Sequence, residues 1–169
     1  MSALSLPARK IGLVSLAILV SLGCFSSDSR AMNLSAYLTF YGFDDNDDGN
    51  PRHLGTNVIS DAVIHPYANE DLGTFDQPGT MAADKHFLSP GTKVYVPSVQ
   101  RYYVVEDTCA ECTRDWRRKR PHIDLFVSGS GEKLAECEDR LTMEVAKIIV
   151  NPPRDLPVKQ GSVCDEGAP

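Results

Sequence analysis

Two aspartates beside apolar, strand-like stretches are the residues of this chain best suited to acid–base chemistry. Asp107 comes just after the run Tyr102–Val105, and Asp124 lies within the run Ile123–Val127. Because an apolar strand disfavours an ionised carboxylate, we expect a raised pKa for Asp124 and a protonated side chain near neutral pH. We therefore predict Asp124 and Asp107 as catalytic residues, with Asp124 as general acid and Asp107, or alternatively Asp44, as base or stabilising partner.

Each aspartate also has a structural interpretation. Asp124 would cap backbone N–H groups where strands cross, and Asp107 would accept hydrogen bonds from its own loop. His122 precedes Asp124 by two residues, so it either orients the acid or faces solvent from the strand. Trp116, the only tryptophan, either stacks on a sugar ring or anchors its loop.

Four cysteines lie in the part of the chain that follows a leader-like segment. An exported chain with an even cysteine count predicts two disulfides, for which three pairings are possible. A zinc site built on the C-x-x-C pair is the competing interpretation, and we expect no metal here. The cysteines are Cys109, Cys112, Cys137 and Cys164.

The first 31 residues have the pattern of a secretory signal peptide. Arg9 and Lys10 precede the apolar run Ile11–Phe25, and a small-x-small pattern ends at Ala31. The alternatives are an uncleaved membrane anchor and lipid modification of Cys24. We predict a secreted protein, extracellular or periplasmic, with no membrane contact after cleavage.

Length and charge define what remains after cleavage. Removal of 31 of the 169 residues leaves 138, enough for one domain with a hydrophobic core. The leader contributes +2 to a net charge of −6, so the mature chain is near −8. This charge argues against nucleic-acid binding, and we expect a monomer. A basic group inside the acidic chain either grips an anionic polymer or forms a solvated loop: Arg114, Arg117, Arg118, Lys119 and Arg120.

Short strands separated by turns must position these residues. We predict little helix: one or two turns within Thr80–Phe87 and a short helix at Glu132–Asp139. A polar loop is expected between the two strands that carry Asp107 and Asp124. This pattern is typical of a small β-barrel or sandwich. The predicted strands are Tyr37–Phe43, Val58–Ile64, Lys93–Pro97, Arg101–Glu106, Ile123–Val127 and Thr142–Val150.

An acidic turn follows the first predicted strand. The spacing of Asp44, Asn46 and Asp48 matches the first half of a calcium loop, but Gly55 occupies the position of the acidic twelfth ligand. A solvated turn is the main interpretation, and a calcium site is the alternative.

Six short motifs occur in an order that resembles a known fold. They are Thr39–Gly42, Met81–Lys85, Pro90–Val96, Val104–Asp107, Cys109-x-x-Cys112 and His122–Leu125. In this order they resemble the double-psi β-barrel shared by rare lipoprotein A, barwin-like proteins, fungal loosenins and the first domain of expansins. The resemblance implies a mainly β, single-domain protein: a six-stranded double-psi β-barrel with short helices over residues 32–151, followed by an irregular tail at 152–169.

The resemblance also implies roles for individual residues. Asp124 matches the aspartate of the expansin His-Phe-Asp motif and the catalytic acid of family 45 glycoside hydrolases. Asp107 matches the aspartate after the central strand in rare lipoprotein A and loosenins, and Tyr41 matches an aromatic that borders the sugar groove. Asp84 falls where rare lipoprotein A has a histidine, and His86 follows two residues later.

These observations favour a secreted protein that binds cell-wall polysaccharide (peptidoglycan, cellulose or pectin) and loosens it without cutting or cleaves it weakly. One alternative is a lytic transglycosylase or endoglucanase acting through Asp124. The other is a protein-binding barrel, such as a protease inhibitor or secreted effector, without catalysis. We predict no cofactor, and the predicted substrate-binding residues are Tyr41, Asp44, Asp84, Trp116 and His122.

Overall fold

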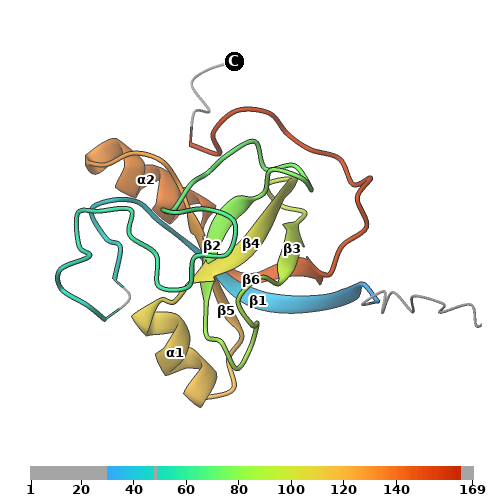
Figure 1. Ribbon diagram of the computed structural model, residues 1–169, viewed down its shortest axis with the longest axis horizontal. Coiled ribbons are helices and arrows are strands. Elements are labelled where there is room, and N and C mark those ends of the chain that lie inside the picture. Colours follow the sequence, from blue (N-terminus) through green and yellow to red (C-terminus); the bar gives the residue numbers. More distant parts are fainter. Residues whose placement is uncertain (1–29, 48, 165–169) are drawn as a thin grey trace, which may run out of the picture.

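Six strands close into a barrel in the order β1-β5-β2-β4-β3-β6 (Figure 1). The computed structural model describes residues 30–47 and 49–164. The predicted mainly β, six-stranded barrel with short helices is therefore confirmed. The elements are β1 (Met32–Tyr41), β2 (Gly79–Ala83), β3 (Lys93–Val96), β4 (Arg101–Asp107), α1 (Ala110–Arg117), β5 (His122–Phe126), α2 (Glu132–Leu141) and β6 (Met143–Val150).

Parallel and antiparallel pairings are mixed in this barrel. β1 pairs in parallel with β5, and β2 pairs in parallel with β4. The other four neighbours pair antiparallel, including β1 with β6, which closes the barrel. This topology is compatible with a double-psi barrel.

Side-chain alternation divides the strands between two hydrophobic clusters. Leu38 of β1 and Ile123 and Leu125 of β5 are buried in the cluster that fills the barrel. Tyr41 and Phe126 belong to a second, smaller cluster on the outside, together with the two cysteines that begin α1. Because successive strand residues face opposite sides, residues next to the inward-facing ones lie on the outer face. Asp124, between the inward-facing Ile123 and Leu125, therefore lies on the outer face.

The segment between Asp107 and β5 contains a helix, so the predicted polar loop is wrong. α1 begins at Cys109, whose Sγ accepts a hydrogen bond from the N–H of Cys112 at 2.8 Å. Cys112 is the only fully buried residue of this helix. Without a stripe of apolar residues, the sequence gives no helical periodicity. The predicted helix at 132–139 is confirmed as α2, with Leu134 and Cys137 buried one turn apart.

One further element prediction is wrong, and another is met only in part. Val58–Ile64 forms no strand, and the side chains of Val63 and Ile64 are about half exposed. One or two helical turns were expected within Thr80–Phe87. A single turn begins at Asp84, whose carbonyl accepts from the N–H of Leu88, but β2 occupies Gly79–Ala83, where all five residues are buried. Its central position between β4 and β5 overrides the helical propensity of its alanines.

The long connection from β1 to β2 is held to the barrel by the buried carboxylate of Glu106. Its Oε1 accepts hydrogen bonds from the N–H groups of Val63, Ile64 and His65, and its Oε2 lies 2.6 Å from His65 Nδ1. Burial alone would raise the pKa of Glu106, but these N–H groups and the His65 side chain hold it below its ordinary value. A side chain thus supplies the partners that a strand would have supplied to Val63 and Ile64.

Two disulfides are present, Cys109–Cys112 and Cys137–Cys164. The first closes the start of α1, so the competing zinc interpretation finds no free thiolates there. The second ties α2 to the tail after β6. Residues 151–164 form neither helix nor strand. The hydroxyls of Tyr95 in β3 and Tyr102 in β4 hold this tail by donating to the carbonyl oxygens of Pro157 and Pro153.

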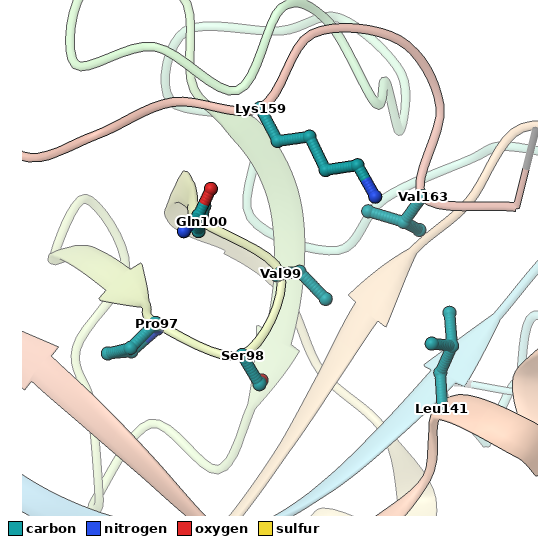
Figure 2. Close-up of a pocket in the computed structure, with 7 residues that line it drawn as sticks. All are labelled: Pro97, Ser98, Val99, Gln100, Leu141, Lys159 and Val163. Carbon is teal, nitrogen blue, oxygen red and sulfur yellow. The ribbon is translucent and has the colours of Figure 1, made fainter. Parts of the chain in front are cut away.

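A cavity of about 400 Å³ lies between the β3–β4 hairpin and the tail. Figure 2 shows Lys159 and Val163 of the tail facing the Pro97–Gln100 turn, with Leu141 at the end of α2 below them. The predicted site residues do not line this cavity. The predicted signal peptide falls almost wholly outside the described residues. Among those that are described, neither α1 nor α2 has the length and apolar character needed to cross a bilayer.

Candidate functional site

Asp124 lies on the outer face of β5, in register with Thr39 of β1. The Thr39 hydroxyl donates a hydrogen bond to Asp124 Oδ1 at 2.7 Å. The side chain is only partly covered, unlike most other residues of β5. Two adjacent strands therefore hold this carboxyl by its backbone and by one of its oxygens, at a position that solvent reaches.

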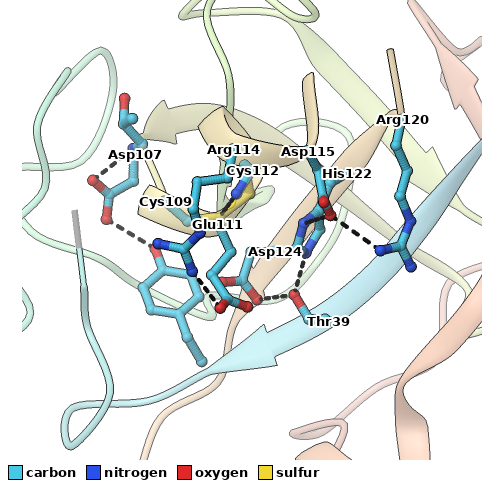
Figure 3. Close-up of a disulfide and its surroundings, with 12 residues drawn as sticks. Thr39, Asp107, Cys109, Glu111, Cys112, Arg114, Asp115, Arg120, His122 and Asp124 are labelled. Atoms are coloured by element: carbon cyan, nitrogen blue, oxygen red, sulfur yellow. Dashed lines mark hydrogen bonds and ion pairs between the residues drawn. A yellow bond between two sulfur atoms is a disulfide. The ribbon is translucent and has the colours of Figure 1, made fainter. Parts of the chain in front are cut away.

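A line of hydrogen bonds continues from Thr39 through His122 to α1 (Figure 3). Thr39 Oγ1 lies 2.9 Å from His122 Nε2, and His122 Nδ1 lies 2.9 Å from Asp115 Oδ2. His122 is only 2 % exposed, so both ring nitrogens rely on these partners. Arg120 completes the line, with Nη1 3.4 Å from the same Asp115 oxygen.

The surroundings shift the pKa values of Asp124 and His122 in opposite directions. Burial raises the pKa of Asp124 to about 8, with the Thr39 hydrogen bond opposing this and the charges of Asp45 and Glu138 adding to it. Burial lowers the pKa of His122, although the Asp115 carboxylate favours its protonated form. At neutral pH the arrangement therefore favours a protonated Asp124 beside a neutral His122.

Asp107 and Asp124 face the same side of the sheet but differ in accessibility. Ala82 of β2 pairs with both of them in register, so their Cα atoms are two strand spacings apart, about 10 Å. Asp107 is only 1 % exposed. Its Oδ1 accepts from the N–H and hydroxyl of Ser60 and from the N–H of Thr108.

The second oxygen of Asp107 is also engaged. Oδ2 accepts a hydrogen bond from the Tyr41 hydroxyl at 3.1 Å. Burial raises the pKa of Asp107, while these bonds to Ser60, Thr108 and Tyr41 lower it. Four donors thus surround a covered carboxylate, an arrangement suited to anchoring the β1–β2 connection.

A family match covers all the elements of this site. A model of the DDB_G0273701 N-terminal domain matches residues 33–168. The chain belongs to this family. The "Uncharacterized protein DDB_G0273701/DDB_G0273221" of Dictyostelium discoideum is 32 % identical over 131 residues, an alignment that covers 76 % of this chain and 55 % of that protein. The chain thus spans about half the length of this curated relative. No solved structure matches.

Within this member of the DDB_G0273701 N-terminal domain family, the other predicted binding residues are spread around the site. Tyr41 is buried and packs edge-on against Phe126, with ring centroids 5.4 Å apart. Trp116 of α1 is half-buried and lies 5.2 Å from the ring of Phe87. Only a part of the Trp116 ring is therefore available to a ligand.

The predicted acidic residues have local partners. Asp44 is exposed and accepts from the N–H of Gly131 at 2.7 Å. Asp84 is buried and accepts from the N–H of His86 at 2.8 Å, which closes its own turn. For the predicted calcium loop, the buried Asn46 directs its Nδ2 at the carbonyl oxygens of Thr56 and Val58, and Asp48 lies outside the described residues.

For three residues of the site, no sequence pattern indicated that they belong to it. Thr39 lies in a motif, but nothing assigned it a partner, and Asp115 lies in the segment predicted to be a loop. Glu138 lies on a charged stretch of α2, where burial and then Asp45 raise its pKa to about 7. Its Oε1 is buried without a hydrogen-bond partner among residues 30–47 and 49–164. Recognition of α1 as a helix would have placed Asp115 one turn after the buried Cys112, on the face that meets the barrel.

Proposed function

We propose that this protein is secreted and binds cell-wall polysaccharide on the outer face of β1 and β5, with the protonated carboxyl of Asp124 at the centre. The supporting observation is the position of Asp124 in a site that solvent reaches. A protonated carboxyl both donates and accepts hydrogen bonds, which suits the hydroxyl groups and ring oxygens of sugars. Thr39 occupies Oδ1, and Oδ2 has no hydrogen-bond partner within the described part of the chain.

The fold and the disulfides support this proposal. The closed barrel with two parallel strand pairs is compatible with the double-psi barrel of expansins and loosenins, and this resemblance favours a cell-wall polymer as the ligand. The two disulfides are typical of an oxidising compartment outside the cytosol, which favours secretion.

The geometry favours loosening or weak lysis over hydrolysis by two carboxylates. Inverting hydrolysis needs a second carboxylate that can activate a water molecule across the sugar. Asp107 has its oxygens occupied by four donors and is covered from solvent. Asp124 supplies an acid, which is enough to polarise or protonate a glycosidic oxygen.

A lytic transglycosylase is the second candidate, because the pKa of Asp124, raised to about 8, keeps the acid protonated at neutral pH. In this reaction Asp124 would protonate the leaving oxygen, and a hydroxyl group of the sugar would close onto the anomeric carbon. The carboxylate left behind would accept the hydroxyl proton. Anhydro-sugar ends would then appear without new reducing ends.

A binding panel on insoluble cellulose, pectin and peptidoglycan at pH 6 tests the proposal. We expect the wild type to bind one polymer and Asp124→Asn to bind it at least about tenfold more weakly. Asp155→Asn, an exposed aspartate of the tail, is the matched control and should bind as the wild type does. Equal binding by Asp124→Asn, or no binding to any polymer, would contradict the proposal and favour a protein-binding barrel.

A further inference from the structure

The hydroxyl of Thr39 stands between two groups that compete for a single proton. It lies 2.7 Å from Asp124 Oδ1 and 2.9 Å from His122 Nε2. A hydroxyl donates one hydrogen bond and accepts others. If both contacts are hydrogen bonds, Thr39 donates to one neighbour and accepts from the other. The protonation of Asp124 and that of His122 are therefore linked through this one group.

Asp115 fixes the other side of the histidine. Its Oδ2 lies 2.9 Å from His122 Nδ1 and also 3.4 Å from Arg120 Nη1. A guanidinium only donates, so this oxygen acts as an acceptor. His122 Nδ1 must then carry a proton, and the Nε2 of a neutral His122 must be an acceptor.

Two arrangements satisfy every contact with the same number of protons. In the first, Asp124 carries the proton on Oδ1 and donates to Thr39, the reverse of the direction in which Thr39 donates to an ionised Asp124. Thr39 then donates to the bare Nε2 of a neutral His122. In the second, the Asp124 Oδ1–H bond breaks as that proton bonds to Thr39 Oγ1, and the original Thr39 proton bonds to the lone pair of Nε2. The products are a carboxylate at Asp124 and an imidazolium at His122, held by Asp115.

We propose that Asp124 and His122 share one proton through Thr39, with Asp115 as a positioning residue that fixes the histidine tautomer and stabilises its imidazolium. The sharing itself does not depend on a ligand. Its use rests on the proposed function: when the shared proton lies on His122, Thr39 can pass a proton back to Asp124, which then gives it to a sugar oxygen.

Other charged and titratable groups face this pair and act on both arrangements. Their elements are β1, the turn after it, α1, the segment after α1, α2 and β6. Tyr41 also lies near the pair: burial, followed by the charges of Asp107 and Asp124, raises its pKa. The groups that face the pair are Tyr37, Asp45, Glu111, Asp115, Arg120, Glu138 and Glu144.

Nuclear magnetic resonance titration of the ligand-free protein tests the proposal. The Asp124 carboxyl carbon and the His122 ring nitrogens would be followed from pH 4 to pH 10. In the wild type we expect the neutral His122 to carry its proton on Nδ1, and both residues to report the same two midpoints, as coupled groups do. A neutral tautomer with the proton on Nε2, or separate midpoints for the two residues, would overturn the proposal.

A matched pair of variants isolates the hydroxyl. Thr39→Ser keeps it and should keep the shared midpoints. Thr39→Val removes it at nearly constant shape, so each residue should titrate alone and the Asp124 midpoint should rise by about one pH unit. Shared midpoints that persist in Thr39→Val would contradict the relay. If Thr39→Val does not fold, the wild-type tautomer decides.

The titration and the polymer panel fail independently. Shared midpoints in a protein that binds no polymer would retain the relay and reject the proposed function. Loss of binding in Asp124→Asn together with separate midpoints would retain the proposed function and reject the relay.

Discussion

Asp107 and Asp124 flank Ala82 in register, on the same face of three adjacent strands. Their environments nevertheless differ. Asp107 is covered from solvent and accepts four hydrogen bonds. Asp124 is partly exposed and accepts a hydrogen bond from Thr39. One position in the barrel therefore anchors a loop, and the equivalent position across β2 faces solvent. Substitutions at the two positions should have different effects.

Asp107→Ala should destabilise the protein. Four donors from Ser60, Thr108 and Tyr41 lose their acceptor, and leaving such groups buried and unpaired costs about 3 kcal/mol or more in total. Urea denaturation monitored by circular dichroism gives the free energy of unfolding. Asp155→Ala is the control and should change it by less than about 0.5 kcal/mol. A similarly small change in Asp107→Ala would show that the connection from β1 to β2 is anchored elsewhere.

Asp124→Asn should stabilise the protein in alkaline solution. The pKa of Asp124 is raised to about 8 from 3.8, so the folded state holds a proton that the unfolded state releases at lower pH. Stability is therefore lost as pH rises from about 4 to about 8, and stays reduced above that range. The asparagine removes this dependence while its carbonyl still accepts from Thr39. At pH 9 we expect a gain of at least about 1 kcal/mol in unfolding free energy.

One result for Asp124→Asn would contradict this prediction. If wild type and variant lose stability in parallel between pH 4 and pH 8, then Asp124 is ionised throughout this range in the folded protein. The same measurement at pH 4 is the internal control, because both forms are then uncharged at this position.

Glu106→Gln should loosen the connection between β1 and β2. The pKa of Glu106 is lowered in the folded state, so its charge stabilises the fold above the unfolded pKa of 4.5, and this stabilisation is lost as pH falls through the folded pKa. We expect a loss of about 2 kcal/mol at pH 7 and faster amide exchange at Val63, Ile64 and His65. Glu136→Gln on the exposed face of α2 is the control. Unchanged exchange at the three amides would refute this role.

The two disulfides should differ in their contribution to stability. Cys137–Cys164 spans 27 residues and Cys109–Cys112 spans 3, for which the chain-entropy relation gives about 3.5 and about 1.6 kcal/mol. We expect the double variant Cys137→Ala with Cys164→Ala to lose more unfolding free energy than the corresponding Cys109 and Cys112 variant. The reverse order would mean that the start of α1 depends on its disulfide by more than chain entropy.

The sequence predicts the barrel well because its strands carry two independent signals. Alternating apolar residues identify β3, β4, β5 and β6 to within a residue or two at each end, and turn residues separate them. The prediction is wrong where a residue distant in sequence provides the hydrogen-bond partners of a segment. Val58–Ile64 has the composition of a strand, but the N–H groups of Val63 and Ile64 donate to the carboxylate of Glu106, more than 40 residues away. No local pattern contains that information.

For the site, the sequence identifies Asp124 and His122 but not what connects them. The contact from His122 to Asp115 depends on α1, which has no apolar periodicity, and on the disulfide and cap at its start. The difference between Asp107 and Asp124 depends on Ser60 and Tyr41, which are distant in sequence. Pairing across a closed barrel creates these contacts, so they follow from topology and not from spacing.

The pairing of β1 with β6 also governs how the protein can reach its native state. Met32 pairs with Val150, so β1 cannot complete its pairing in the barrel until β6 is available. Contacts this far apart in sequence make folding slow. During synthesis, the edge of β1 that pairs with β6 therefore stays open until residues 143–150 have emerged. A chaperone that shields this edge should therefore raise the folding yield more than one that acts on the C-terminal tail.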